Sequence, residues 1–311
     1  MQKISIVVPV YCNAETLFSL HNRLIEVGKN LKSLNILTEI IYVDDGSTDN
    51  SYFKLLEIKK NDNQVIVVKL TRNFGSVNAI KAGTTLITGD VFTFLSADLQ
   101  DPPELIFKMV EKWKKGSIFT ICVRASRADP VFTKLLSYFY YKIIRIAIFK
   151  DFPRGGFDMA LMDKVILPYL QKSSKNLYLI PLIYWLGYKP EIIYYHREKR
   201  KFGKSKWSIP KKITAFLDVI LSFSILPIRI MSLLGIVVSL LSFGYGILVV
   251  ITAIHHGNTS PGYASIVAIV TFLLGLIILC LGLIGEYLLR ILDQGNPRPE
   301  YVIEQILKLD K

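Results

Sequence analysis

A short polar motif directly after an apolar run is the first place where residue types in this sequence suggest chemistry. The run Val91–Leu95 is predicted to be a buried strand, and Asp98 and Gln100 follow it two residues apart. Carboxylate and amide oxygens at a strand end suit a hard divalent cation that holds a phosphate-bearing ligand. The same residues could form an ordinary turn before a helix over residues 104–115, which Pro103 could open. The stretch alone leaves both interpretations open.

The elements that would position this motif follow from hydrophobic patterning. Apolar runs predict strands at residues 4–10, 39–43, 65–70 and 118–123, and helical spacing predicts helices at 15–34 and 77–88. This alternation predicts an α/β fold with a parallel, doubly wound sheet. Polar motifs follow each of these strands: Tyr11-Cys-Asn13, Asp44-Asp45, Arg72-Asn73 and Arg124-Ala-Ser-Arg127. All would meet at the carboxyl edge of the sheet, where ligands bind in open α/β folds.

Composition indicates a membrane protein rather than a nucleic-acid binder. The 311 residues are 51% hydrophobic and carry a net charge of +13. Residues 230–254 and 264–285 contain no charged side chain, and each is long enough to cross a hydrocarbon core of ~30 Å. A basic run over residues 197–212 precedes the first span, and further basic residues follow the second. The excess of Lys and Arg on these flanks predicts that both chain termini are cytoplasmic.

Several common enzyme motifs are missing from the sequence. It contains no GxGxxG fingerprint, no GxxxxGK[ST] loop and no GxSxG elbow. Its three cysteines are far apart and form no CxxC pair, which argues against a disulfide framework and a zinc site. What remains is a Rossmann-like sheet with carboxylates at one edge and a membrane anchor.

Four motifs in order resemble one enzyme family. They are Ile6-Val-Val-Pro-Val-Tyr11, Val43-Asp-Asp-Gly-Ser-Thr-Asp49, Arg72-Asn-Phe-Gly75 and Ala97-Asp-Leu-Gln-Asp-Pro-Pro-Glu-Leu105. The chain resembles the inverting family-2 glycosyltransferases of GT-A fold, and among them the polyisoprenyl-phosphate glycosyltransferases related to dolichol-phosphate mannose synthase. The segment Gly203-Lys-Ser-Lys-Trp207 and the two spans resemble the bacterial branch that glycosylates undecaprenyl phosphate.

The resemblance implies a role for each matching residue. The nucleotide-sugar would contact Pro9, Tyr11, Asn13, Asp44, Asp45, Arg72 and Asn73, and Asp98 and Gln100 would hold Mg²⁺ or Mn²⁺ against the diphosphate. The catalytic set would be Asp98, Asp158, Arg124 and Arg127, with both arginines facing the lipid phosphate; Lys204, Lys206 and Trp207 would bind lipid at the membrane.

The chain also departs from the family pattern. Ser96 stands where many relatives have an acid, Asn13 stands where they often have Glu, and the segment around Asp158 differs from theirs. Because a lipid phosphate is already ionised, we expect no strong general base, and Asp158 would position a substrate. An Asp158→Asn variant should therefore keep substantial activity.

These expectations define one leading function. The protein would transfer one sugar, with UDP-glucose as the expected donor, to undecaprenyl phosphate with inversion, at the cytoplasmic face of a bacterial inner membrane. UDP-N-acetylhexosamine or GDP-mannose as donor, a processive polysaccharide synthase and a non-catalytic membrane scaffold are the alternatives. The expected parts are a GT-A catalytic domain (1–196), a basic amphipathic segment (197–228), two transmembrane helices (229–290) and a cytoplasmic tail (291–311). The glycine-bearing spans also allow a homo-oligomer.

Overall fold

The computed structural model describes residues 1–126, 140–153, 155–173, 179–198, 209–256, 262–296 and 298–308. The chain forms two compact units, which are treated separately below. One comprises Met1–Val219 together with Arg298–Lys311, and the other comprises Ile220–Pro297. The first unit is built on an eight-stranded sheet, and the second is a helical hairpin.

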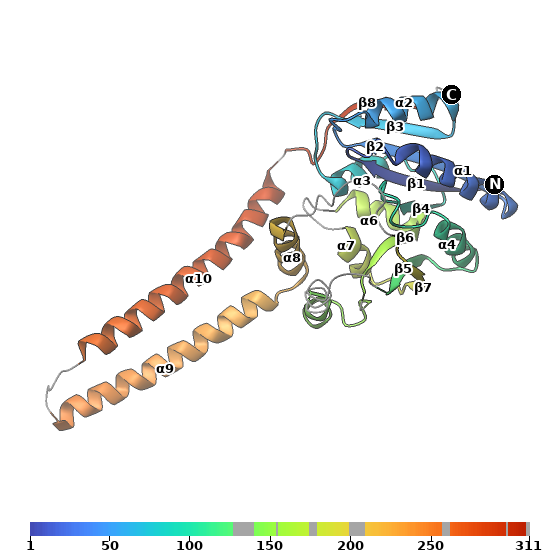
Figure 1. Cartoon of the computed structure of the whole chain (residues 1–311). Helices are drawn as coiled ribbons and strands as arrows, with labels where there is room; N and C mark the ends of the chain where they lie inside the picture. Colours follow the sequence, from blue (N-terminus) through green and yellow to red (C-terminus); the bar gives the residue numbers. More distant parts are fainter. Residues whose placement is uncertain are drawn as a thin grey trace. The chain divides into compact units, whose positions relative to one another are not determined.

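Four parallel strands form the middle of the sheet: β1 (Gln2–Val10), β2 (Ile36–Asp44), β3 (Val65–Leu70) and β4 (Val91–Phe94). Their helices are α1 (Leu17–Ser33), α2 (Ser51–Asn61), α3 (Ser76–Thr84) and α4 (Leu105–Lys114). Ile4 and Ile6 of β1 join the core that α1 and α4 complete. Val7 faces the other way and meets α3 at Gly83, where a Cβ atom would collide with it. Helices therefore cover both faces of the sheet, as predicted (Figure 1).

The remaining strands make the sheet mixed. They are β5 (Phe119–Ser126), β6 (Phe157–Asp163), β7 (Glu191–His196) and β8 (Ile303–Leu307), with η1 (Lys164–Ile166), α6 (Leu167–Gln171) and α7 (Leu179–Trp185) between β6 and β7. The strand order is β7-β5-β6-β4-β1-β2-β3-β8. The strand predicted at residues 118–123 is β5, but β6 lies between it and β4 and runs antiparallel to both. The predicted α/β fold is confirmed, whereas the antiparallel strands did not follow from the pattern.

The end of the chain belongs to this sheet. Residues 291–311 were expected to be a tail, but β8 pairs antiparallel with β3 at the sheet edge (Figure 1). Lys69 Nζ forms an ion pair with Glu304 at 2.8 Å. Just before the strand, Glu300 accepts a hydrogen bond at 2.7 Å from Lys81 on α3, whose side chain is only 5% exposed. The chain thus leaves the first unit at Val219 and returns to complete it.

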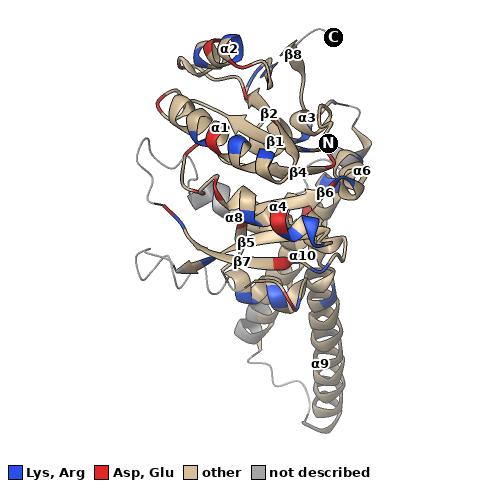
Figure 2. Ribbon diagram, turned by 90° about the vertical axis from the view of Figure 1, so that its right-hand side faces the viewer, with Lys and Arg blue, Asp and Glu red and all other residues tan. Residues whose placement is uncertain are grey.

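Two long apolar helices form the second unit. After α8 (Ile209–Phe223), which runs across the boundary of the units, come α9 (Leu226–His256) and α10 (Tyr263–Gly295). Within them, Leu226–Leu248 and Phe272–Leu292 are long and apolar enough to cross a membrane, and neither stretch is buried by protein. Most of α9 carries no charged residue (Figure 2). So large an exposed apolar surface is typical of contact with lipid.

Candidate active site

The first two polar motifs meet where β1 and β2 end. Val10 and Asp44, the last residues of these strands, lie opposite each other in register. Beyond them, Asn13 Oδ1 accepts a hydrogen bond from the Tyr11 backbone N–H at 3.1 Å, which closes a tight turn. Cys12 inside this turn has a positive φ of 51°, an unusual conformation for a residue other than glycine. Asn13 therefore shapes the turn that carries Tyr11, while Pro9 lies within β1 opposite Val43.

Asp44 has a buried carboxylate that is only partly satisfied. Its residue is 1% exposed, and its Oδ2 accepts a hydrogen bond from the Ser47 backbone N–H at 3.3 Å. Its Oδ1 is buried and has no hydrogen-bond partner among the described residues. Burial raises the pKa of Asp44 despite the bonds from Ser47. Since buried carboxylate oxygens are nearly always hydrogen-bonded, this atom is suited to a ligand that brings an N–H or O–H donor.

Asp45 holds the loop that follows β3. Its Oδ1 accepts from the backbone N–H of Phe74 at 2.7 Å and its Oδ2 from that of Gly75 at 2.9 Å. Gly46 allows this approach, because a Cβ atom there would collide with the backbone of Arg72. Burial raises the pKa of Asp45 to about 6, although the two N–H groups lower it. Asp45 thus positions Arg72 and its neighbour Asn73, and Arg72 in turn stacks on the ring of Phe74 at 4.1 Å.

The turn after β4 is held in a strained conformation. Asp98 is buried, and its Oδ1 accepts a hydrogen bond from the Gln100 backbone N–H at 3.2 Å. Leu99 between them has a φ of 59°, which is rare for a bulky side chain. The hydroxyl of Thr16, the residue just before α1, donates a hydrogen bond at 2.6 Å to the Ala97 carbonyl in this turn. Strain of this kind persists only where surrounding contacts enforce it, and it is common at functional sites.

The donor atoms at this turn fit a divalent cation only in part. Asp98 and Gln100 offer hard oxygen atoms, but Ser96 is exposed and brings no charge. Across the described ranges, no group of three His, Cys, Asp or Glu residues could hold a metal ion. Mg²⁺ commonly binds one or two carboxylates and completes its shell with water and substrate phosphates. The residues present therefore fit a cation that shares its ligands with a diphosphate.

A side-chain network occupies the other half of the edge. Arg124 at the end of β5 donates to Asp158 of β6 through Nε at 2.5 Å and Nη2 at 2.6 Å. Burial lowers the pKa of Arg124, but the bonds and charge of Asp158 outweigh this and raise it. The Tyr195 hydroxyl of β7 lies 3.2 Å from Asp158 and donates to Asp101 at 2.7 Å. Arg197 Nε lies 3.2 Å from the same Asp101 oxygen.

Asp101 and Tyr195 are functional candidates that sequence reasoning missed. Asp101 is 2% exposed, and burial, with the nearby charge of Asp158, raises its pKa to about 6. It lies within the motif that begins at Asp98, which could have drawn attention to it. Tyr195 had no comparable signal, because its strand was not clearly predicted. Four predicted site residues, Arg127, Lys204, Lys206 and Trp207, lie outside the described residues.

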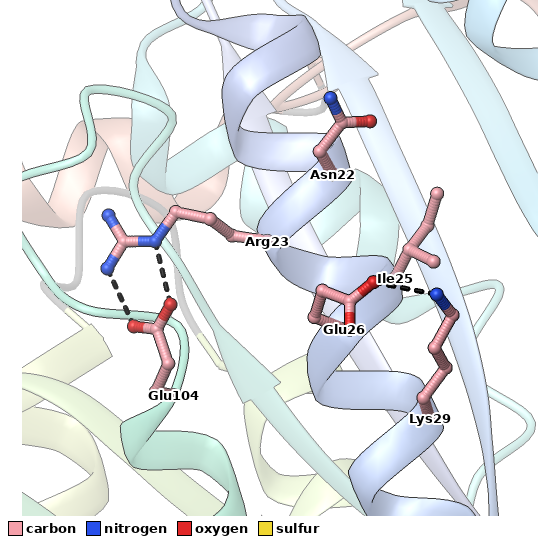
Figure 3. A pocket seen from close by; sticks show the side chains of 6 residues that line it. All are labelled: Asn22, Arg23, Ile25, Glu26, Lys29 and Glu104. Carbon is pink, nitrogen blue, oxygen red and sulfur yellow. Dashed lines mark hydrogen bonds and ion pairs between the residues drawn. The ribbon is translucent and has the colours of Figure 1, made fainter.

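A hollow between α1 and α4 contains none of the predicted site residues (Figure 3). Arg23 crosses it and donates to Glu104 through Nε at 2.8 Å and Nη2 at 2.6 Å. Arg23 also donates to Glu198 at 2.9 Å, and the Glu198 backbone N–H donates to the Gln100 carbonyl at 3.0 Å. These contacts fix the chain around the Asp98 turn, so their role is structural support.

Comparison with known proteins agrees with this architecture. Residues 5–170 match Glycosyl transferase family 2, and residues 226–291 match the GtrB C-terminal hairpin. An uncharacterized glycosyltransferase of Synechocystis sp. is 37% identical over 311 residues, covering 99% of this chain and 96% of that protein. A prophage bactoprenol glucosyl transferase homolog of Escherichia coli is 31% identical over 308 residues, covering 98% and 100%. The bactoprenol glucosyl transferase of Shigella phage SfX is 31% identical over 304 residues, covering 97% and 99%.

Among solved structures, glucosyl-3-phosphoglycerate synthase from Mycobacterium tuberculosis aligns with a TM-score of 0.48 at 17% identity, over 70% of this chain and 80% of that one.

The family match spans more than half of the chain, and the relatives match it nearly end to end. The chain therefore belongs to glycosyl transferase family 2 and is a glycosyltransferase with a GtrB-type C-terminal hairpin.

Proposed function

We propose that the protein transfers a single glucose from UDP-glucose to undecaprenyl phosphate, with inversion, at the cytoplasmic face of a bacterial inner membrane. The observation that carries the proposal is the buried Oδ1 of Asp44, which accepts no hydrogen bond from any described residue. It lies at the edge of the sheet that also bears the Asp98 turn and the Arg124–Asp158 pair. The end-to-end match to proteins named bactoprenol glucosyl transferases supports the choice of sugar and acceptor.

The first half of the edge would bind the donor. Asp44 Oδ1 would accept a hydrogen bond from a base N–H or a ribose hydroxyl. Asp45 would keep Arg72 and Asn73 in place through its bonds to the loop backbone. Asp98 and Gln100 would hold Mg²⁺ or Mn²⁺ against the diphosphate, and such a cation offsets the charge that develops on the leaving group.

The second half would receive the acceptor. Lipid phosphate needs no deprotonation before it attacks the anomeric carbon, so positive side chains that orient it matter more than a base. Arg124, oriented by Asp158, would face this phosphate together with Arg127. Lys204, Lys206 and Trp207 would contact lipid at the membrane surface.

Chain connectivity supports the proposed topology. The hairpin begins and ends in the same α/β unit, because the chain returns at Arg298 and pairs β8 with β3. If α9 and α10 cross the bilayer, both flanks of the hairpin must lie on the side that holds the sheet. The N-terminus, the catalytic unit and the C-terminus would then all be cytoplasmic, as the basic flanks also favour.

Transfer by the full-length protein in nanodiscs tests the function. We expect UDP release from UDP-glucose to require undecaprenyl phosphate and Mg²⁺ or Mn²⁺, and to stop after one sugar per lipid. Mass spectrometry would show a monoglucosylated lipid, and NMR a β-linkage made from the α-linked donor. Preference for UDP-N-acetylhexosamine or GDP-mannose would contradict the donor assignment. A polymeric product, or no lipid-dependent turnover with any of these donors, would contradict the reaction itself.

A further inference from the structure

A hollow of about 440 Å³ opens in the first unit and reaches Arg124. Its walls include Ile192 and Tyr194 of β7, and Arg145, Lys150 and Phe152 from the chain between β5 and β6. Arg124 stands at the end of β5, on the same edge of the sheet as the donor motifs. A molecule bound in this hollow would therefore approach the edge where transfer takes place.

Two of the three cations that line the hollow have no carboxylate partner among the described residues. Arg124 is paired with Asp158, but neither Arg145 nor Lys150 forms an ion pair with any residue of the described ranges. Arg145 instead donates from Nε to the Tyr141 carbonyl at 3.3 Å. One acid, Asp151, also lines the hollow, so the wall remains net positive. Two cations close in sequence and unpaired at a concave surface are suited to an anion.

The rim of the same hollow is apolar and exposed. Tyr194 is 69% exposed and Ile192 is 43% exposed, while Phe152 is buried in the wall. Ile146, which follows Arg145 in the helical segment 140–147 but does not line the hollow, is 72% exposed. Unpaired cations within an exposed apolar rim fit an anionic amphiphile better than a soluble anion.

We propose that this hollow binds the phosphate end of the acceptor lipid, a polyisoprenyl phosphate. Arg145 and Lys150 bind the phosphate, and the first isoprene units lie against Ile192 and Tyr194. The assignment rests on the proposed function, and neither cation lies in the motifs described above. The position of Arg124 in the wall distinguishes this lipid from a bulk phospholipid, because only the acceptor needs its phosphate at the reaction edge.

Kinetics of Arg145→Gln, Lys150→Gln and the double variant test the proposal in the full-length protein, in phosphatidylcholine nanodiscs. Charged hydrogen bonds contribute enough that we expect the KM for undecaprenyl phosphate to rise roughly 10-fold or more in the double variant. The KM for UDP-glucose should stay within about twofold. Lys142→Gln is the matched control, since Lys142 is exposed on the same helical segment and does not line the hollow. An unchanged acceptor KM in the double variant, or an equal rise in donor KM, overturns the proposal.

A second set of variants separates charge from folding. Arg145→Lys and Lys150→Arg keep the charge, so together they should leave the acceptor KM within roughly threefold of the wild type. If this pair loses as much acceptor affinity as the glutamine pair, while melting at the same temperature, the phosphate contact is not the cause and the proposal fails.

Direct binding separates failure of this inference from failure of the proposed function. Calorimetry with farnesyl phosphate, farnesol and inorganic phosphate does not depend on transfer. We expect the wild type to bind farnesyl phosphate at least roughly 10-fold more tightly than it binds farnesol or inorganic phosphate. The double variant should bind farnesyl phosphate at least roughly 10-fold more weakly than the wild type does. If wild-type protein shows no transfer but this pattern holds, only the proposed reaction is wrong. Equal binding by the double variant, or equal competition by phosphatidylglycerol, overturns the acceptor site.

Discussion

The two halves of the sheet edge hold their polar groups in different ways. On the β1–β4 side, backbone amides fix the carboxylates: Asp44 accepts from Ser47, Asp45 from Phe74 and Gly75, and Asp98 from Gln100. On the β5–β7 side, side chains hold one another in the chain Arg124–Asp158–Tyr195–Asp101. The first arrangement relies on short turns, and the second requires three strands to be in place.

This difference suggests a division of labour. Backbone donors are rigid and need no reorganisation, which suits recognition of a donor whose shape is constant. A network of partly buried side chains is cooperative, and the loss of one member leaves the others unsatisfied. We therefore expect changes in the first half to act mainly on donor and metal binding, and changes in the second half to act on stability as well.

The largest expected effect comes from Asp98→Ala. Asp98 is the one carboxylate that the proposed metal site contains, because Ser96 brings no charge. Its removal should lower kcat/KM for UDP-glucose by roughly 100-fold or more, since a metal ion supplies several kcal/mol of charge stabilisation. UDP release at saturating Mn²⁺ is the measurement. Ser96→Ala is the matched control and should stay within about twofold. If metal-dependent transfer is unchanged in Asp98→Ala, Asp98 does not hold the metal ion, and the proposed nucleotide-sugar site is wrong.

A double-mutant cycle on Arg124→Gln and Asp158→Asn should give the next largest effect. The two side chains are 15% and 25% exposed, so each single change leaves a partly buried partner unsatisfied. Each should cost about 1–3 kcal/mol, and the double variant should lose about 1–2 kcal/mol less than the sum. Thermal and denaturant unfolding of the purified protein would measure this coupling.

The exposed pair Lys29–Glu26 on α1 supplies the control for this cycle. Its side chains are 63% and 67% exposed, so its coupling should stay below about 0.5 kcal/mol. Additive effects at Arg124 and Asp158 would show that the second half is not held by a cooperative network.

The same difference explains how much the sequence could predict. Strands β1 to β5 were predictable because each contains a continuous apolar run. Asp44 and Asp98 were placed at the edge of the sheet because they lie at or shortly after the ends of such runs. The network of Asp101 and Tyr195 was not predictable, because it depends on how β6 and β7 are ordered in the sheet. Likewise β8 pairs with β3 although Lys69 and Glu304 are 235 positions apart. Local patterning contains no information about such a distant partner.

The last expected effect concerns the pH dependence of stability at Asp45, where burial and backbone hydrogen bonds shift the pKa in opposite directions. Burial raises the pKa of this carboxyl to about 6, whereas the amides of Phe74 and Gly75 lower it. A raised pKa means that the folded protein binds the proton more tightly than the unfolded chain does. The stability that Asp45 contributes is then fully present below pH ~4 and is lost as the pH rises through about 6.

The difference in free energy of unfolding between the wild type and Asp45→Asn should therefore fall between pH 4 and pH 7, by on the order of 2 kcal/mol. Asp101, whose pKa is also raised to about 6, titrates in both proteins and largely cancels in this difference. Denaturant unfolding at several pH values would give the slope. A difference that rises with pH would mean that the two amides outweigh burial, because the pKa of Asp45 would then lie below its ordinary value. The sign of this slope thus reports how strongly backbone amides hold the donor half of the edge.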